Sequence, residues 1–167
     1  IGVETRYGSN KGSYSVIDSL VTLGFRYPKR ASFFKSELEQ FLLLAREQGM
    51  DPNLVKGSYA GAMGIPQFIS SSYRNYAIDF DDDGKIDIWE NAADAIGSVA
   101  NYFKVHGWEK GKPITLKANV SGNNIDEVLG KSLEPDKTIG ELMDYGISTN
   151  ISIADNIKAK LLMYELE

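Results

Sequence analysis

The sequence predicts a mainly α protein in which a helical domain is followed by a small α+β appendage. Two observations lead to this fold class. Apolar residues recur at helical spacing in several segments before residue 106, whereas a strand-like alternation of apolar and polar residues begins after Pro113. In addition, 43% of the 167 residues are hydrophobic, which is enough to build a packed core.

Two helices are predicted in the first third of the chain. The first covers residues 14–26, with Ser13 placed to cap its start and Pro28 to end it. The second covers residues 29–48 and has one strongly apolar face, and Gly49 marks its end. We expect the aromatic residues of that face to belong to the core.

A glycine-rich segment, residues 57–64, interrupts the helical pattern. In a helix each of its glycines would cost about 1 kcal/mol relative to alanine, so we expect a tight, close-packed turn. Pro66 suits the first turn of a short helix that ends near Tyr76. A further helix is predicted over residues 90–105.

The sequence changes character at residues 106–113, which are rich in glycine and charge. We therefore predict a helical domain over residues 1–108 and a small α+β domain over residues 109–167. The elements expected in the second domain are a strand over 113–120, helices over 124–131 and 138–145, and a closing strand over 159–166.

Composition excludes several classes of protein. The net charge of −5 is concentrated in residues 79–94, and no basic stripe is present, so we expect no nucleic-acid binding. The absence of cysteine rules out disulfides, thiolate metal sites and a cysteine nucleophile. No apolar run approaches the roughly 20 residues that a membrane helix needs. Because the chain begins at Ile1 without a methionine, we expect a piece of a longer protein.

Residues 79–90 match the twelve-residue EF-hand calcium loop. Carboxylates occupy positions 1, 3, 5 and 9, glycine position 6, an aliphatic residue position 8 and glutamate position 12. Oxygen ligands of this number favour Ca²⁺ over zinc, copper or magnesium. The predicted ligands are the side chains of Asp79, Asp81 and Asp83 and the backbone carbonyl of Lys85. A solvated acidic turn is the alternative interpretation, and a single loop favours a structural ion over a sensor.

Several motifs in order along the chain resemble the bacterial membrane-bound lytic murein transglycosylase B family. The segments that carry the resemblance are residues 2–8, 27–30, 56–68, the acidic loop, and 93–103. The similarity is close over residues 1–108 and weaker in the appendage.

This resemblance implies a lysozyme-like helical core that contains one calcium loop. It also implies cleavage of the β-1,4 bond between N-acetylmuramic acid and N-acetylglucosamine in peptidoglycan, which leaves a 1,6-anhydro end. Glu4 falls on the catalytic glutamate of the family, which acts first as acid and then as base. A carboxylic acid that donates a proton near neutral pH needs an apolar pocket, so we expect Glu4 to be buried at the floor of a cleft.

The remaining site assignments also follow from the resemblance. Ser58 and Gln67 match residues that hydrogen-bond the sugar, and Met63 and Phe68 match apolar residues that line the cleft. Two further assignments have structural alternatives. Tyr102 matches an aromatic residue near the catalytic acid but suits a helix core equally well. Arg30, next to Lys29, matches a basic residue that meets the acidic stem peptide, although both suit a solvated helix start.

Two candidates could complete the calcium site. The family closes a longer loop, here residues 79–94, with the aspartate that matches Asp94, whereas Glu90 occupies position 12 of the shorter loop. The two residues are four apart and would share one face of a helix, so either could reach the ion. We favour Asp94 slightly.

The resemblance also implies a cellular setting. We expect a monomer that binds peptidoglycan glycan strands in the bacterial periplasm or cell envelope, with membrane attachment as an outer-membrane lipoprotein through a segment outside these residues. The family has further segments before residue 1 and after Glu167, including one that completes the cleft, so we expect little or no activity from this chain alone. The alternatives are a hydrolytic lysozyme and a non-catalytic, calcium-stabilised peptidoglycan-binding module.

Overall fold

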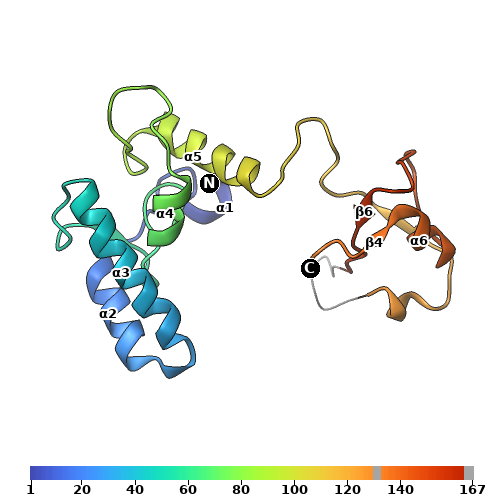
Figure 1. The fold of residues 1–167 in the computed structure, drawn as a ribbon, viewed down its shortest axis with the longest axis horizontal. Helices are drawn as coiled ribbons and strands as arrows, with labels where there is room; N and C mark the ends of the chain where they lie inside the picture. Colours follow the sequence, from blue (N-terminus) through green and yellow to red (C-terminus); the bar gives the residue numbers. More distant parts are fainter. Residues whose placement is uncertain (130–132, 164–167) are drawn as a thin grey trace. The chain divides into compact units, whose positions relative to one another are not determined.

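The computed structural model describes residues 1–129 and 133–163, which divide into two compact units, Ile1–Lys110 and Gly111–Glu167 (Figure 1). The expected domain boundary after residue 108 lies two residues from this division. No described helix is both long and apolar enough to cross a membrane.

Unit Ile1–Lys110 is mainly helical, as predicted. Its helices are α1 (Gly2–Thr5), α2 (Val16–Arg26), the 3₁₀ turn η1 (Pro28–Arg30), α3 (Ala31–Glu47), α4 (Ser70–Tyr76) and α5 (Ala92–Val105). Helices α2 and α3 pack against each other, and α4 packs against α3 and α5 (Figure 1). The short strands β1 (Tyr14–Ser15) and β2 (Lys56–Gly57) pair antiparallel.

The predicted helix starts are too early by two to four residues, and each has an identifiable cause. Helix α2 is capped by the Ser15 hydroxyl, not by Ser13, because residues 14 and 15 pair with β2. Pro28 opens the separate turn η1 before α3 begins. The short helix predicted from Pro66 starts at Ser70, and Asn91 caps α5, which was expected from residue 90.

The core of this unit is formed mainly by the inward faces of α2 and α3 and by residues of the glycine-rich turn and the acidic loop. Its buried hydrophobic members are Val16, Leu20, Phe34, Phe41, Leu44, Met63, Phe68, Tyr73 and Ile88. Gly64 has a φ of +67°, and a Cβ there would lie 2.6 Å from the Ile88 carbonyl oxygen. Only glycine therefore lets the turn approach the end of the acidic loop so closely.

The second unit is a small α+β structure with a core of Val128, Leu142 and Ile147. Strand β3 (Ala118–Val120) pairs with β5 (Ile147–Thr149), and β4 (Lys137–Thr138) pairs with β6 (Lys158–Ala159), both antiparallel. Helix α6 (Ile139–Asp144) begins at a capping box formed by Thr138 and Glu141.

Several predictions for this unit were wrong in extent. The strand expected over residues 113–120 forms only over the last three of them, and the helix expected over 124–131 is the 3₁₀ turn η2 (Ile125–Glu127). The closing strand is shorter than expected, and β5 was missed. Residues 130–131 and 164–166 of the predicted elements lie outside the described residues.

Candidate functional site

Helix α1 is a single turn that is held against the glycine-rich turn by Thr5. The buried Thr5 hydroxyl donates to the Ile65 carbonyl oxygen at 2.9 Å and accepts from the Gly8 amide at 3.0 Å. Glu4, its neighbour on the same turn, is exposed. Successive residues on a helix point about 100° apart, so the face that docks Thr5 leaves Glu4 facing outward.

The expectation that Glu4 is buried is therefore wrong for this structure. None of the described residues encloses its carboxylate, so they do not form the apolar pocket that we expected around this side chain.

Ser58 and Gln67 both shape the glycine-rich turn. The Ser58 hydroxyl accepts from the amides of Ala60 and Ala62, at 3.3 and 3.1 Å. Gln67, which has a positive φ of 54°, donates through Nε2 to the carbonyls of Gly64 and Lys11. Among the described residues, no partner is found for the Ser58 hydroxyl hydrogen or the Gln67 amide oxygen, so each side chain keeps one group for a ligand.

Met63 and Phe68 belong to the core and not to an accessible surface. Their backbones form a reciprocal antiparallel pair, with N···O distances of 2.8 and 3.0 Å. Met63 has no exposed surface and Phe68 is 8% exposed, so the prediction that Met63 lines a cleft is wrong here. The half-buried Tyr102 lies 5.9 Å from the Phe68 ring and stacks on His106 at 4.1 Å. These contacts fit the alternative interpretation of Tyr102 as a packing residue.

Arg30 is exposed at the end of η1. Its guanidinium lies over the rings of Phe33 and Phe34, at 4.4 and 5.1 Å from their centroids. Cation–π contacts of this kind hold the side chain at the start of α3 while its charge stays in solvent. This geometry suits a solvated helix start, and it also leaves the charge accessible to an acidic peptide.

An open pocket of about 350 Å³ lies beside the start of α2. Its lining consists of Tyr14, Ser15, Asp18, Ser19, Thr22, Leu23 and Tyr59. It therefore includes none of the residues predicted to contact a sugar.

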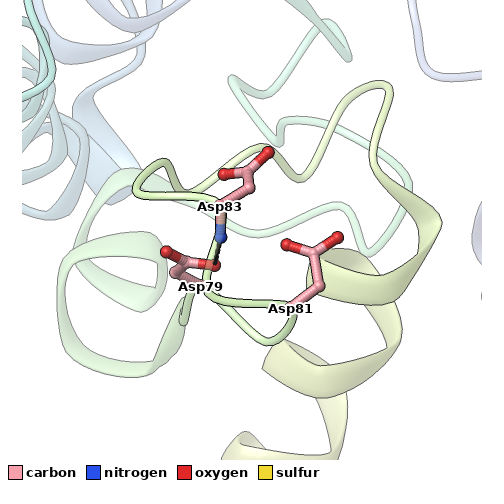
Figure 2. A group of neighbouring side chains, drawn as sticks. All are labelled: Asp79, Asp81 and Asp83. Atoms are coloured by element: carbon pink, nitrogen blue, oxygen red, sulfur yellow. Dashed lines mark hydrogen bonds between the residues drawn. The ribbon is translucent and has the colours of Figure 1, made fainter.

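The acidic loop brings three predicted metal ligands together. Asp79, Asp81 and Asp83 each offer a carboxylate oxygen, and these oxygens lie within 4.8 Å of one another (Figure 2). The Asp79 carboxylate also accepts from the amides of Asp83 and Gly84, at 3.2 and 2.8 Å. The Lys85 amide donates to Asp83 at 2.9 Å, which closes the turn.

The two candidates for closing the loop differ in environment. Asp94 is completely buried in the first turn of α5, and its two oxygens accept from the amides of Phe80 and Asp87, each at 2.8 Å. Glu90 is exposed and forms an ion pair with Lys11 at 2.7 Å. The structure brings neither residue into the group of three aspartates.

Tyr73 supports the same loop from α4. Its hydroxyl donates to the Ile86 carbonyl oxygen at 2.7 Å. Burial raises the pKa of Tyr73 well above its usual range, and the charges of Asp87 and Asp94 add to this increase. The hydroxyl therefore remains a donor at all physiological pH values.

Sequence reasoning missed Thr5, Lys11 and Tyr73. Thr5 lies inside one of the motifs that carried the family resemblance, and that position was the available signal. The partners of Lys11 and Tyr73 could not be predicted, because Lys11 meets residues 78 and 79 positions away and Tyr73 bonds a carbonyl in an irregular loop.

The helical unit, with its N-terminal turn docked on a glycine-rich turn and its acidic loop, has a lysozyme-like lytic transglycosylase fold. The chain belongs to the transglycosylase SLT domain family, which matches residues 1–166. It is 45% identical over 166 residues to membrane-bound lytic murein transglycosylase B of Escherichia coli K12, covering 99% of this chain and 45% of that protein.

Solved structures support the same assignment. The soluble lytic transglycosylase SltB1 from Pseudomonas aeruginosa is similar with a TM-score of 0.87 and 52% identity, over 94% of this chain and 52% of that one. The Escherichia coli lytic transglycosylase Slt35 in complex with calcium is similar with a TM-score of 0.83 and 45% identity, over 96% of this chain and 50% of that one. The chain thus spans about half the length of these relatives.

Proposed function

We propose that this chain is part of a lytic transglycosylase that cleaves the β-1,4 bond between N-acetylmuramic acid and N-acetylglucosamine in peptidoglycan. The observation that carries the proposal is the 52% identity to SltB1, a lytic transglycosylase, with a TM-score of 0.87 over 94% of the chain. At this identity the site residues are expected to share a chemistry as well as a fold.

Glu4 is the proposed acid and base. It donates a proton to the bridging oxygen, and the bond from that oxygen to C1 of the muramyl sugar breaks, so the glucosamine leaves with a hydroxyl group. The C6 hydroxyl oxygen then bonds to C1 and gives its proton to the Glu4 carboxylate, which restores the acid. Since the substrate supplies the nucleophile, no second carboxylate is needed.

The exposure of Glu4 bears on the activity of this chain alone. The Glu4 side chain is open to solvent and is not enclosed in the apolar cleft in which a general acid is expected to act. We therefore expect this chain by itself to cleave peptidoglycan weakly or not at all.

Ser58 and Gln67 are expected to orient the sugar. They would do so through the Ser58 hydroxyl hydrogen and the Gln67 amide oxygen, for which no protein partner is described.

The acidic loop is a proposed site for a structural Ca²⁺. Calcium–oxygen distances of about 2.3–2.6 Å allow ligands on opposite sides of the ion to lie about 5 Å apart, which fits the three aspartate oxygens within 4.8 Å. The Slt35 structure in complex with calcium supports the choice of ion. When bound, the ion would neutralise the repulsion among Asp79, Asp81 and Asp83.

The side chain that completes this site is proposed to be Asp94. It is buried and already contacts both halves of the loop, through the amides of Phe80 and Asp87. Glu90 is held by Lys11 instead. The Lys85 carbonyl remains the proposed backbone ligand.

We place this activity in the bacterial cell envelope, because peptidoglycan is found there and because a relative is named membrane-bound. Glycan strands are the proposed partner, and a monomer is the proposed state. Attachment to the outer membrane as a lipoprotein is part of the same proposal.

Mass spectrometry of digested peptidoglycan tests the function directly. The protein at its natural length should release fragments that end in 1,6-anhydro-muramic acid. Reducing ends would indicate a hydrolytic lysozyme and would overturn the transglycosylase assignment. The exposure of Glu4 favours a binding module as the second candidate. That candidate would be supported if the protein bound glycan strands and released no fragments.

A further inference from the structure

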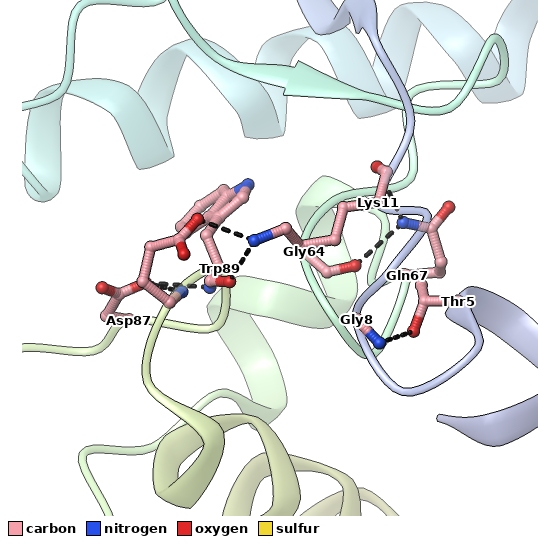
Figure 3. Close-up of polar contacts among 8 residues, drawn as sticks. Thr5, Gly8, Lys11, Gly64, Gln67, Asp87 and Trp89 are labelled. Atoms are coloured by element: carbon pink, nitrogen blue, oxygen red, sulfur yellow. Dashed lines mark hydrogen bonds and ion pairs between the residues drawn. The ribbon is translucent and has the colours of Figure 1, made fainter.

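Lys11 joins two parts of the unit that are far apart in sequence. Its ammonium group donates to the Trp89 carbonyl oxygen at 2.8 Å and to the Glu90 carboxylate at 2.7 Å (Figure 3). Its backbone carbonyl accepts from Gln67 Nε2 at 3.2 Å. The side chain of Lys11 is only 28% exposed, whereas that of Glu90 is 79% exposed. Lys11 is therefore held in place at the end of the acidic loop.

Residues 5–13, which contain Lys11, directly follow Glu4, and this segment is fixed near both ends. At one end, Thr5 is bonded to the Ile65 carbonyl. At the other, Gly12 has a φ of +85°, and a Cβ there would lie 2.2 Å from the Gly57 carbonyl oxygen. Among the described contacts of the residues between these two anchors, the Lys11 side chain makes those that reach the acidic loop (Figure 3).

The end of the acidic loop is in turn tied to the rest of that loop. The Asp87 carboxylate accepts from the amides of Trp89 and Glu90, at 2.8 and 2.9 Å, and the Asp87 amide donates to Asp94. A change in how well the acidic loop is ordered would therefore also affect the Trp89 carbonyl and the Glu90 carboxylate, which bind Lys11.

We propose that Lys11 is a positioning residue that couples the acidic loop to residues 5–13, the segment directly after Glu4, so that a cation held by the loop also orders that segment. The inference rests on the proposed calcium site. It assigns Lys11 no contact with substrate. A coupling of this kind is reciprocal, so ordering of the segment would also favour the cation.

A second contact also connects the acidic loop to this segment, and the test has to separate its effect from that of Lys11. The Ile65 amide donates to the Ile88 carbonyl at 2.9 Å, so the loop also contacts the turn on which Thr5 docks. A variant that removes only the Lys11 ammonium separates the two routes, because it leaves this backbone bond in place.

Amide hydrogen exchange of the chain, with calcium and with a chelator, tests the proposal. In the unaltered chain, calcium should slow exchange by about fivefold or more both in residues 79–94 and in residues 5–13. In Lys11→Met, calcium should slow exchange only in the loop, and Lys11→Arg should restore the response. Lys104→Met is the matched control, since Lys104 is exposed on α5 and no side-chain partner is described for it.

Each result decides the matter. If residues 5–13 respond to calcium in Lys11→Met as in the unaltered chain, the backbone route carries the effect and the role of Lys11 is overturned. If calcium slows exchange in the acidic loop of the unaltered chain but not in residues 5–13, the coupling is overturned and the calcium site is retained. A loop that does not respond at all overturns the calcium site and the coupling with it.

Discussion

Asp94 gives the most direct test of how the acidic loop is held in shape. It has no exposed surface, and each of its oxygens accepts one backbone amide, from Phe80 and from Asp87. In Asp94→Asn one oxygen remains, so one of these amides would face an NH₂ group instead of an acceptor.

The expected loss follows from the bond that disappears. A hydrogen bond to a charged group contributes about 1.5–3 kcal/mol, and a buried donor left without an acceptor adds to the loss. We therefore expect the free energy of unfolding of unit Ile1–Lys110 to fall by about 2 kcal/mol when calcium is chelated. With a urea m-value of about 2 kcal/mol/M, the midpoint should fall by about 1 M.

Tryptophan fluorescence is a suitable assay, because both tryptophans of the chain, Trp89 and Trp108, lie in this unit. Asp82→Asn is the matched control: it removes the same charge from the same loop, and Asp82 is exposed with no side-chain partner among the described residues. Its midpoint should move by less than about 0.3 M. Equal shifts in the two variants, or no shift in Asp94→Asn, would refute the bridging role of Asp94.

Three further predictions concern other parts of the unit. Calcium at about 100 times its Kd should raise the free energy of unfolding by about 2.7 kcal/mol, and a melting temperature insensitive to chelator would contradict the proposed site. Gly64→Ala should lower the free energy of unfolding, measured in urea, by about 2–4 kcal/mol, because the new Cβ would meet the Ile88 carbonyl. Gly49 also has a positive φ but lies in open space, so Gly49→Ala should cost only about 1 kcal/mol. Equal effects of the two substitutions would refute the close approach at Gly64. The hydrogen bond from Arg74 lowers the pKa of Glu47, so this pair should stabilise the fold fully above the ordinary glutamate value of 4.5 and lose its effect as pH falls through the lowered pKa. An NMR titration in which Arg74→Met left the Glu47 pKa unchanged would contradict that cause.

The helices of the first unit could be predicted because each buries one face at a regular spacing. The apolar stripe predicted for residues 29–48 contains Phe34 and Phe41, which the structure buries. The starts of the helices could not be placed as well, because they depend on backbone pairings that the helical pattern does not show. Strand β1 meets β2 some forty residues later, and the pairing of Met63 with Phe68 delays α4.

The second unit was harder to predict from pattern alone. Residues 113–117 alternate like a strand, yet the structure pairs only residues 118–120, with β5. Whether an alternating segment becomes a strand depends on a partner, and β5 is too short to give a clear signal.

The candidate site shows the same division between local and non-local information. The spacing of Asp79, Asp81 and Asp83 predicted that they would come together, and they do. Burial could not be predicted in this way. Glu4 is exposed and Met63 is enclosed. The exposure of each side chain depends on the residues that pack around it, which its own motif does not specify.

Glu4 is the proposed group for both proton transfers, and one measurement tests this role most directly. Peptidoglycan would be digested with the protein at its natural length and with its Glu4→Gln and Glu39→Gln variants, and the anhydro-muramyl ends counted by mass spectrometry. Glu39 is an exposed glutamate of α3 with no described side-chain contact. We predict that Glu4→Gln lowers the yield by about a hundredfold or more, as expected for loss of a general acid and base, while Glu39→Gln keeps it. An unchanged yield of anhydro ends from Glu4→Gln would contradict the claim.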